Sequence, residues 1–369
     1  MKSRWHRGVV GCLCLGLLSV AGFSEAFKLS PEGTVLEKTI AKRHSSWLEK
    51  AFILVSDRGL KHFTEAVHEE VTQRTYGCEG DPDVCGNPDI GFASAFVIAG
   101  VRWNDDPPFQ FETGTSAPTS CKVTETVRFL TQPKCWYDVF REAQSRAAKN
   151  QPVDTATKSP MLARSHFGDL QFLHAMASMN GERAAETRER VLMWTEFAWR
   201  VATGEFTLAL KLRDVKTNRF SEFFGTSGRN VQDLFSLGNP TLRPRIHEVA
   251  FGSLLHTIQD SFAKGHVDRA EPVANVLCPG SAEAAPGRIL SFRSYTQQDL
   301  DKHAEYDSRT AFAERWTLEH PSVVDVGRVL RQYFEKGSSW TSVKPYVECL
   351  FIVEDADAKA TPGAGLARQ

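Results

Sequence analysis

Apolar residues recur every three or four positions along much of this chain. The clearest example covers 191–214, where VLMWTEFAWRVATGEFTLALKLRD carries an apolar stripe. The same spacing occurs over 246–263 and 323–336, and over 60–76 and 170–179. Because this spacing matches the 3.6 residues of a helical turn, each segment predicts an amphipathic helix.

Alternation of apolar and polar residues, which is typical of strands, is scarce. Glycines mark candidate loops at 77–88, 105–121, 217–229 and 278–287. With no internal repeat and no evident linker, we expect an all-α fold with one multi-helical domain. The last segment, 355–369, is small and polar, and we expect it to be a disordered tail.

The first segment, 1–26, has the features of a secretory signal peptide. Basic residues precede an apolar run over 9–21, and Ser24 and Ala26 supply the small residues of a cleavage site. The apolar run is too short for a good membrane anchor. We therefore expect a secreted or periplasmic protein whose helical domain covers 27–354.

Cysteine usage fits that expectation. Six cysteines lie after the signal segment, and an even number in an exported protein favours three disulfides. The absence of a C-x2-C motif among them disfavours a thiolate zinc site. Pairing by proximity, which is one of many connectivities that six cysteines allow, gives Cys78–Cys85, Cys121–Cys135 and Cys278–Cys349.

The net charge of −1 changes the picture little, and it stays slightly negative without the signal segment. Such a balance, with no evident basic groove interleaved with aromatic residues, argues against a stable nucleic-acid partner. It does not exclude an anionic substrate, because bound metal ions would add local positive charge.

Candidate chemistry is concentrated in HTIQDSFAKGH, which begins at His256 and has the pattern H-x3-D-x5-H. His256 and Asp260 are four residues apart, so they project from one face of a helix. His266 follows a glycine at which the helix can end and the chain can fold back. A second pair, His303 and Asp307, repeats the four-residue spacing. Each pair alone suits a hydrogen-bonded structural pair, but together they favour a borderline metal ion such as zinc.

Three other segments carry residues of the same types. His68 lies in HEEVT, a sequence that is also common on solvated helix faces. Asp105 and Asp106 lie before a proline, where a carboxylate can equally cap a turn. His166 has more polar neighbours than His174, so we favour His166 as the ligand, and His174 as a histidine that packs in the core or supports a ligand; the choice between the two stays open.

The order His, Asp, His, H-x3-D-x5-H, H-x3-D resembles that of the zinc-dependent phospholipases C and the related single-strand-specific zinc nucleases. The resemblance spans 68–307, and its specificity comes from the combination of elements. Both groups are all-helical and hold three zinc ions in one cleft, so the resemblance implies two or three zinc ions here.

The resemblance also implies a role for each residue. His166, His256 and Asp260 hold one zinc ion, and Asp260 bridges to a second ion that His68 also binds. Asp105 is a metal ligand that also orients the attacking water or acts as general base. The residues implied for the third zinc ion are His266, His303 and Asp307.

Two of these assignments depend on the local sequence: the choice of aspartate and the N-terminal ligand. Asp105 is preferred over Asp106 because WND is similar to the W-x-D of the nuclease branch. In the family, an N-terminal Trp binds zinc shortly before the first histidine, whereas the expected terminus here, Phe27, lies about 40 residues before His68. Either the N-terminal arm folds back, or another ligand such as His62 substitutes, or that ion is absent.

We expect a monomeric zinc-dependent phospholipase C that contacts a membrane surface transiently and hydrolyses phospholipids to diacylglycerol and a phosphorylated head group. Clustered zinc suits this chemistry because it neutralises non-bridging oxygens and activates water. Two alternatives stay open. One is a nuclease or nucleotidase of the same superfamily, and the other is a non-catalytic secreted helical protein that zinc stabilises.

Overall fold

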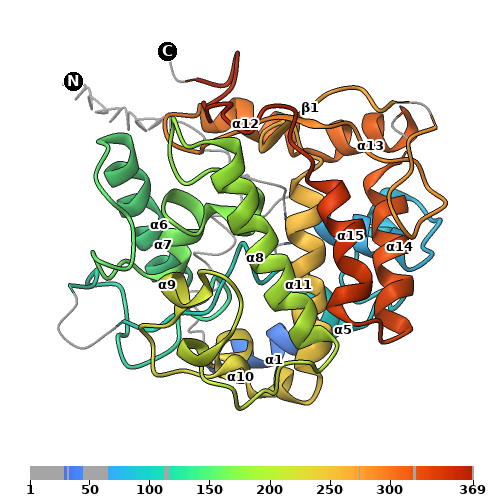
Figure 1. Ribbon diagram of the computed structural model, residues 1–369. Helices are drawn as coiled ribbons and strands as arrows, with labels where there is room; N and C mark the ends of the chain where they lie inside the picture. The colour runs from blue at the N-terminus through green and yellow to red at the C-terminus, as the bar shows by residue number, and fades with distance from the viewer. Residues whose placement is uncertain are drawn as a thin grey trace, which may run out of the picture.

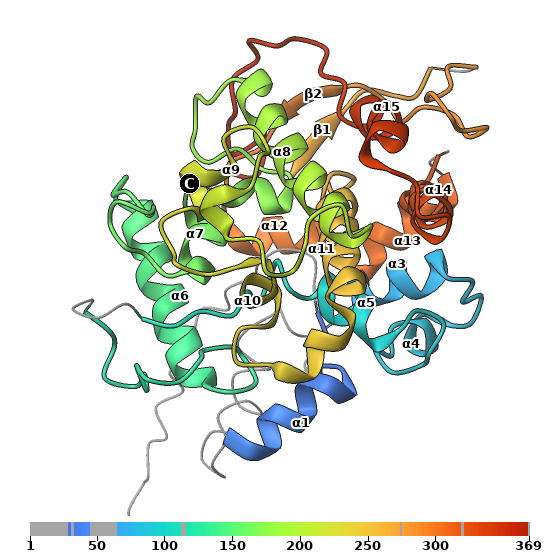
Figure 2. The ribbon, with the colours of Figure 1, turned by 60° about the horizontal axis from the view of Figure 1, so that its bottom comes forward.

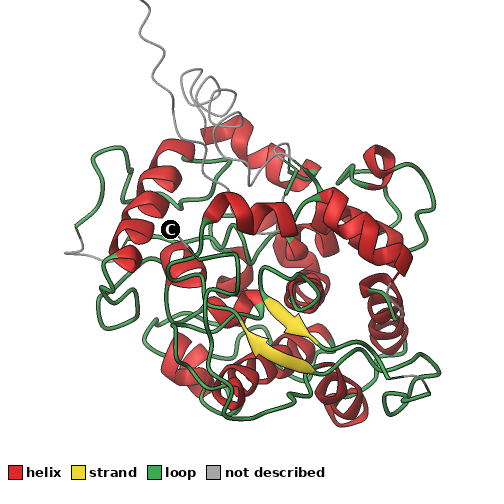
Figure 3. Cartoon of the chain, turned by 90° about the horizontal axis from the view of Figure 1, so that it is seen from above, coloured by secondary structure: helices red, strands yellow, loops and turns green. Residues whose placement is uncertain are grey.

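The computed structural model describes residues 29–30, 33–44, 65–111, 116–273, 275–318 and 321–367. The signal segment and His62 lie outside these residues. The described chain is mostly helical, which confirms the predicted helical character (Figure 1). Its strands are short: β1 (Val267–Arg269) and β2 (Ile289–Phe292) form an antiparallel hairpin (Figure 3).

The described helices share no single length or composition, and short ones alternate with long ones. The α-helices are α1 (Val35–His44), α3 (Val67–Thr75), α4 (Pro82–Cys85), α5 (Ala95–Val101), α6 (Pro133–Ala148), α7 (Met161–Phe167), α8 (Ala184–Ala202), α9 (Phe220–Phe224), α10 (Val231–Ser236), α11 (Ile246–Asp260), α12 (Leu300–Tyr306), α13 (Arg309–Leu318), α14 (Val323–Glu335) and α15 (Trp340–Leu350). The 3-10 helices are η2 (Gln171–His174), η3 (Leu212–Asp214) and η4 (Pro240–Arg245).

Helix α11 lies at the centre of the fold. Every residue over 249–260 is buried, as expected for a helix that is covered on all sides. It packs against α5 and α8, with α6 and α7 on one side of the molecule and α14 and α15 on the other (Figures 1 and 2).

Two glycines allow α5 and α11 to approach closely. A Cβ atom on Gly100 would lie 2.1 Å from the carbonyl oxygen of Val249, and one on Gly252 would lie 2.1 Å from that of Val97. Any larger residue at either position would push the helices apart. The close approach places the end of α5, and therefore Asp105, beside the histidine face of α11.

The predicted helices correspond to the structure to different degrees. The predicted segments 246–263 and 323–336 contain the whole of α11 and α14. Helix α8 ends at Ala202, because the chain turns through Gly204 at a positive φ of 77°. The predicted helix over 170–179 is only the short η2, which ends where Ala175 adopts a φ of 52°.

All three disulfides expected from proximity are present. The longest-range of them joins the loop between β1 and β2 to α15. Disulfides are typical of oxidising compartments. Among the described residues, no helix is both long and apolar enough to cross a membrane. The three bonds are Cys78–Cys85, Cys121–Cys135 and Cys278–Cys349.

The C-terminal segment corrects the prediction of a disordered tail, because 355–367 packs against the domain. The main chain of Ala360 donates to the carbonyl of Glu182 and accepts from the amide of Gly181, each at 2.8 Å. Leu366 is 2% exposed. The segment lacks an apolar stripe because backbone hydrogen bonds, which composition does not reveal, hold much of it in place.

Candidate metal centre

The predicted site residues come from separate segments and meet in one buried region. His68 lies on α3, Asp105 follows α5, and His166 lies near the end of α7. Two others lie on α11, and the rest lie just beyond α11 and on or just after α12. None of these residues, with His174 added, is more than 3% exposed: His68, Asp105, His166, His174, His256, Asp260, His266, His303 and Asp307.

Their side chains form two groups. In the first, which we call the central cluster, three overlapping triads each place their ligand atoms within 4.8 Å of one another. In the second, which we call the peripheral triad, the three ligand atoms also lie within 4.8 Å of one another. The central cluster is His68, Asp105, His166, His174, His256 and Asp260; the peripheral triad is His266, His303 and Asp307.

Asp105 lies between four imidazoles. Its Oδ1 is 3.9 Å from Nε2 of His166 and 3.7 Å from Nδ1 of His174. Its Oδ2 is 3.9 Å from Nε2 of His68 and from Nδ1 of His256. Two ligands of one tetrahedral zinc ion stand about 3.3 Å apart. These separations are therefore too long for hydrogen bonds but near the range for ligands of a shared cation.

Asp260 lies near four histidines. Its Oδ2 is 2.9 Å from Nδ1 of His174 and 2.9 Å from Nε2 of His256. Its Oδ1 is 3.4 Å from Nε2 of His68. The same Oδ2 lies 3.7 Å from Nδ1 of His266. Asp260 therefore joins the central cluster to the peripheral triad, a position that suits a bridging carboxylate.

Hydrogen bonds fix the orientation of the rings. Nδ1 of His256 donates to the carbonyl oxygen of Val101 at 2.7 Å. Nδ1 of His68 lies 2.6 Å from Oε1 of Gln259. The ring of His266 is held in the same way by a main-chain carbonyl. A proton on Nδ1 leaves Nε2 with a lone pair, which is the form that binds a metal ion.

Several buried polar atoms of the site have no hydrogen-bond partner in the described part of the chain, and a bound cation would account for them. Within the described residues, both ring nitrogens of His303, both carboxylate oxygens of Asp307 and Oδ1 of Asp260 make no hydrogen bond. Nε2 of His303 is only 2.8 Å from Oδ2 of Asp307. Buried polar atoms nearly always have partners. A metal ion in the peripheral triad would engage one ring nitrogen of His303 and a carboxylate oxygen of Asp307, and another in the central cluster would engage Oδ1 of Asp260, so the residues fit bound cations.

Burial keeps three imidazoles of the central cluster neutral. It lowers the pKa of His166 to about 3, where the neighbouring His174 adds to the effect. Burial also lowers the pKa of His174 and of His256 to about 4, against the opposing attraction of Asp260. All three rings are therefore unprotonated near neutral pH, as metal binding requires.

The carboxylates carry more negative charge than the histidines balance. Burial and then repulsion by Asp260 raise the pKa of Asp105 well above its usual range. For His266, burial lowers the pKa, but Asp260 and Asp307 outweigh it and raise the value to about 9. The site thus retains protons to limit its negative charge, a task that a divalent cation can take over.

Asp106 points away from the histidines. Its Oδ1 accepts from the amide of Phe129 at 2.9 Å and from Nε1 of Trp136 at 3.0 Å, and its Oδ2 accepts from Nε of Arg128 at 3.1 Å. Successive residues thus have opposite roles, with Asp105 directed into the cluster and Asp106 anchoring the chain behind it.

A buried chain of ion pairs continues from Asp106. Arg128 also binds Glu37 at 2.9 Å, and Arg102 binds Glu37 at 3.0 Å. Arg102 pairs in turn with Glu69, the neighbour of His68. The residues adjacent to two ligands are therefore fixed in a single network, which holds α3 and the end of α5 in register.

Residues 29–30 lie against this network, while the expected terminus, Phe27, lies outside the described residues. The amide of Ser30 donates to Glu69 at 3.0 Å, and Arg102 donates to the carbonyl of Ser30 at 2.8 Å. Leu29 is fully buried. The chain just after the predicted cleavage site thus lies close to His68, although it is distant in sequence.

His174 is the site residue that sequence reasoning favoured as a packed or supporting histidine. Its neighbours Phe172 and Leu173 are indeed buried. Its own Nδ1, however, lies 3.0 Å from Nε2 of His256, inside the central cluster. The structure brings His166 and His174 together, with their rings 5.0 Å apart. The sequence prediction assumed an open cleft with polar surroundings. For a site buried in the core, the apolar neighbours of His174 would have favoured it as a candidate ligand.

Gly265 explains how the peripheral triad closes. A Cβ atom there would lie 2.9 Å from Nδ1 of His303 and 3.3 Å from Oδ1 of Asp307. The missing side chain thus leaves the space that the triad occupies after α11 ends.

Comparisons of the chain with protein-family models, curated proteins and solved structures found no match. The case for a function therefore rests on the residues of the site and on the sequence pattern that they follow.

Proposed function

We propose that this protein is a zinc-dependent hydrolase of phosphoric diesters, and that its substrates are phospholipids, which it cleaves as a phospholipase C. The observation that carries the proposal is the convergence of three buried aspartates and six histidines into two joined groups, in the sequence order described above. Structural zinc sites need four ligands, whereas this set is large enough for several ions.

The overlapping triads indicate which residues would hold the ions. The central cluster offers two sets that share Asp105, one with His68 and His256 and one with His166 and His174. The peripheral triad offers a third. Bound zinc ions would neutralise the charge of a phosphodiester and lower the pKa of a water molecule.

The chain's own residues would orient the ligand rings and the attacking water. The main-chain carbonyl of Val101 and the side-chain oxygen Oε1 of Gln259 accept from the rings of His256 and His68 and hold them in the ligand tautomer. Asp105, whose pKa burial and Asp260 raise, is the carboxylate that we propose to orient or deprotonate the attacking water. Secretion is part of the proposal, supported by the three disulfides and the signal-like segment 1–26.

The direct test combines metal analysis with turnover. His256→Ala should lower the zinc content of the purified protein and abolish hydrolysis of a short-chain phosphatidylcholine. His247→Ala is the matched control, because its ring contacts the carbonyl of Val201 away from the cluster. Full activity of the His256 variant would refute the metal assignment. Zinc without turnover in the unmodified protein would favour the non-catalytic alternative.

One observation favours the nuclease alternative. Cationic and aromatic side chains, among them Lys158, Arg229 and Phe111, line a pocket behind α7. The WND motif itself adds nothing here: the ring of Trp103 is buried and stacks on Trp194 with centroids 5.5 Å apart. Parallel assays on short-chain phosphatidylcholine and single-stranded DNA would separate the two activities.

A further inference from the structure

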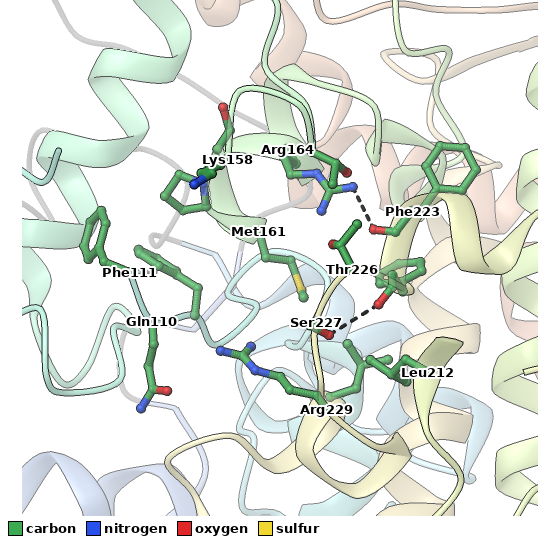
Figure 4. A pocket seen from close by; sticks show the side chains of 16 residues that line it. Gln110, Phe111, Lys158, Met161, Arg164, Leu212, Phe223, Thr226, Ser227 and Arg229 are labelled. Atoms are coloured by element: carbon green, nitrogen blue, oxygen red, sulfur yellow. Dashed lines mark hydrogen bonds between the residues drawn. The ribbon is translucent and has the colours of Figure 1, made fainter. Parts of the chain in front are cut away.

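A large pocket lies between the loop that joins β1 to β2 and the end of α15. Its volume is about 890 Å³, which is in the range of pockets that hold an organic ligand. The cavity beside α7, shown in Figure 4, measures only about 100 Å³. Figure 2 shows β1, β2 and α15 on the same side of the molecule. We call the large space the hairpin pocket; the loop contributes most of its lining, and α8, β2 and the chain around the end of α15 contribute the rest.

Five apolar side chains that line the hairpin pocket are exposed to solvent. Their exposed fractions lie between 39% and 65%. Single exposed apolar residues are common on proteins, but a group that shares one concave surface is typical of a binding site. A ligand that covers these side chains removes apolar surface from water, so the pocket favours an alkyl chain. The five are Val273, Val276, Leu277, Leu290 and Ile352.

Contacts behind the hairpin pocket hold the loop in place. A disulfide joins Cys278 to α15. The hydroxyl of Tyr333 donates to the carbonyl of Gly280 at 2.9 Å. Within the loop, the amide of Ala285 donates to the carbonyl of Val276 at 2.7 Å. The pocket is therefore formed before a ligand arrives, and little loss of chain entropy opposes binding.

Two of the three carboxylates that line the hairpin pocket have cationic partners. Glu354 pairs with Arg288 at 3.2 Å. Glu348 pairs with Lys344 at 3.4 Å. Each pair cancels its own charge, so neither gives the pocket an excess of one sign.

One cation and one anion of the lining remain. Arg188 makes no ion pair with a described carboxylate, and its Nε donates to the carbonyl of Phe351 at 2.7 Å, which orients the guanidinium without neutralising it. Glu271 likewise has no ion-pair partner among the described residues. A guanidinium binds oxyanions, and a carboxylate attracts an ammonium group. A zwitterionic head group therefore matches the two charges together.

We propose that the hairpin pocket binds a single molecule of a zwitterionic lipid. The alkyl chain lies along the five apolar side chains, while the anionic part of the head group contacts Arg188 and the ammonium part contacts Glu271. The balanced charge of the lining favours such a head group over a purely anionic or cationic one. This binding goes beyond the proposed hydrolysis, because it uses no residue of the metal centre and requires no metal ion.

The experiment titrates dodecyl sulfobetaine into the full-length mature protein by calorimetry, below the micelle concentration. This molecule carries an alkyl chain and a zwitterionic head group but no phosphodiester, so hydrolysis at the metal centre contributes nothing to the signal. Decyl sulfobetaine, which is two methylene groups shorter, should bind roughly tenfold more weakly. Dodecyl maltoside, which has the same chain and an uncharged head group, should also bind about tenfold more weakly.

Substitutions test the two parts of the hairpin pocket separately. Val276→Asp should weaken binding about tenfold or more, because it places a charge among the apolar side chains. Val123→Asp is the matched control, since both valines are 48% exposed and Val123 lies outside the pocket. Arg188→Gln and Glu271→Gln should each weaken binding of dodecyl sulfobetaine about tenfold and leave that of dodecyl maltoside unchanged. Circular dichroism checks that each variant is folded.

The outcomes separate this proposal from the metal assignment. Saturable binding that is lost in the pocket variants and kept in Val123→Asp supports the hairpin pocket, whether or not the protein hydrolyses any substrate. Metal-loaded and chelator-stripped protein should bind equally, and if the stripped protein unfolds, the metal-loaded form alone carries the test. No saturable binding, or equal binding by all variants, overturns the proposal. Dodecyl maltoside that binds as tightly as the sulfobetaine overturns the part concerning the head group.

Discussion

Replacing Gly265 by alanine should damage the peripheral triad alone. The new Cβ atom would lie 2.9 Å from Nδ1 and 3.0 Å from Cε1 of His303. Ordinary contacts begin near 3.4 Å, so the ring must move by about 0.5 Å, more than the roughly 0.2 Å that metal–ligand distances tolerate. We expect zinc affinity at this triad to fall by about 10–100-fold, a loss typical of disturbed ligand support.

The assay is zinc per chain by elemental analysis after dialysis against a weak chelator. The Gly265→Ala protein should retain the zinc of the central cluster and lose that of the peripheral triad. Gly228→Ala is the control, because nothing lies within 4 Å of its Cβ position and its φ is not positive. Unchanged zinc content and turnover in Gly265→Ala would refute the view that the space beside His303 is needed for metal binding.

Three other predictions concern the surroundings of the site. Asp106→Asn breaks a buried pair with Arg128 and should cost about 3 kcal/mol in denaturant unfolding without changing zinc content; a loss of zinc would make Asp106 a ligand. Replacing Cys278 and Cys349 by serine opens a link across 71 residues and should cost about 4 kcal/mol; an unchanged urea midpoint would contradict this. Burial lowers the pKa of His256 from 6.5 to about 4, so its contribution to stability is present above pH 6.5 and lost as pH falls toward 4. The metal-stripped protein should therefore melt earlier at about pH 4.5 than at about pH 7, and equal midpoints would count against it.

The candidate ligands could be predicted from sequence where spacing alone determines geometry. His256 and Asp260 share a face of α11 because helical neighbours four residues apart always do. Whether His68 or Asp105 reaches that face depends on the contact between α5 and α11, which two glycines make possible. That contact is a property of packing between distant segments, so periodicity could not reveal it.

The sequence pattern also misplaced the end of α8 and the order of the C-terminal segment, because an apolar pattern does not report backbone hydrogen bonds. The apolar stripe over 191–214 continues past α8, since half-buried residues such as Leu208 still pack against the core from a turn. The C-terminal segment has no stripe, yet Ala360 is 3% exposed. An apolar pattern reports which residues are covered, whereas backbone hydrogen bonds and positive-φ positions such as Gly204 decide where a helix stops.

The separate origins of the ligands also connect the metal centre to the fold. Residues between His68 and Asp307 meet in a region that excludes solvent, and it contains three carboxyl groups, among which burial and repulsion by Asp260 raise the pKa of Asp105. Burying such charge without a cation costs several kcal/mol. The buried ion pairs behind Glu69 and Asp106 fix the backbone so that this arrangement persists. We therefore expect metal binding and folding to be coupled in this protein, because an ion bound there would stabilise the native state that assembles its candidate ligands.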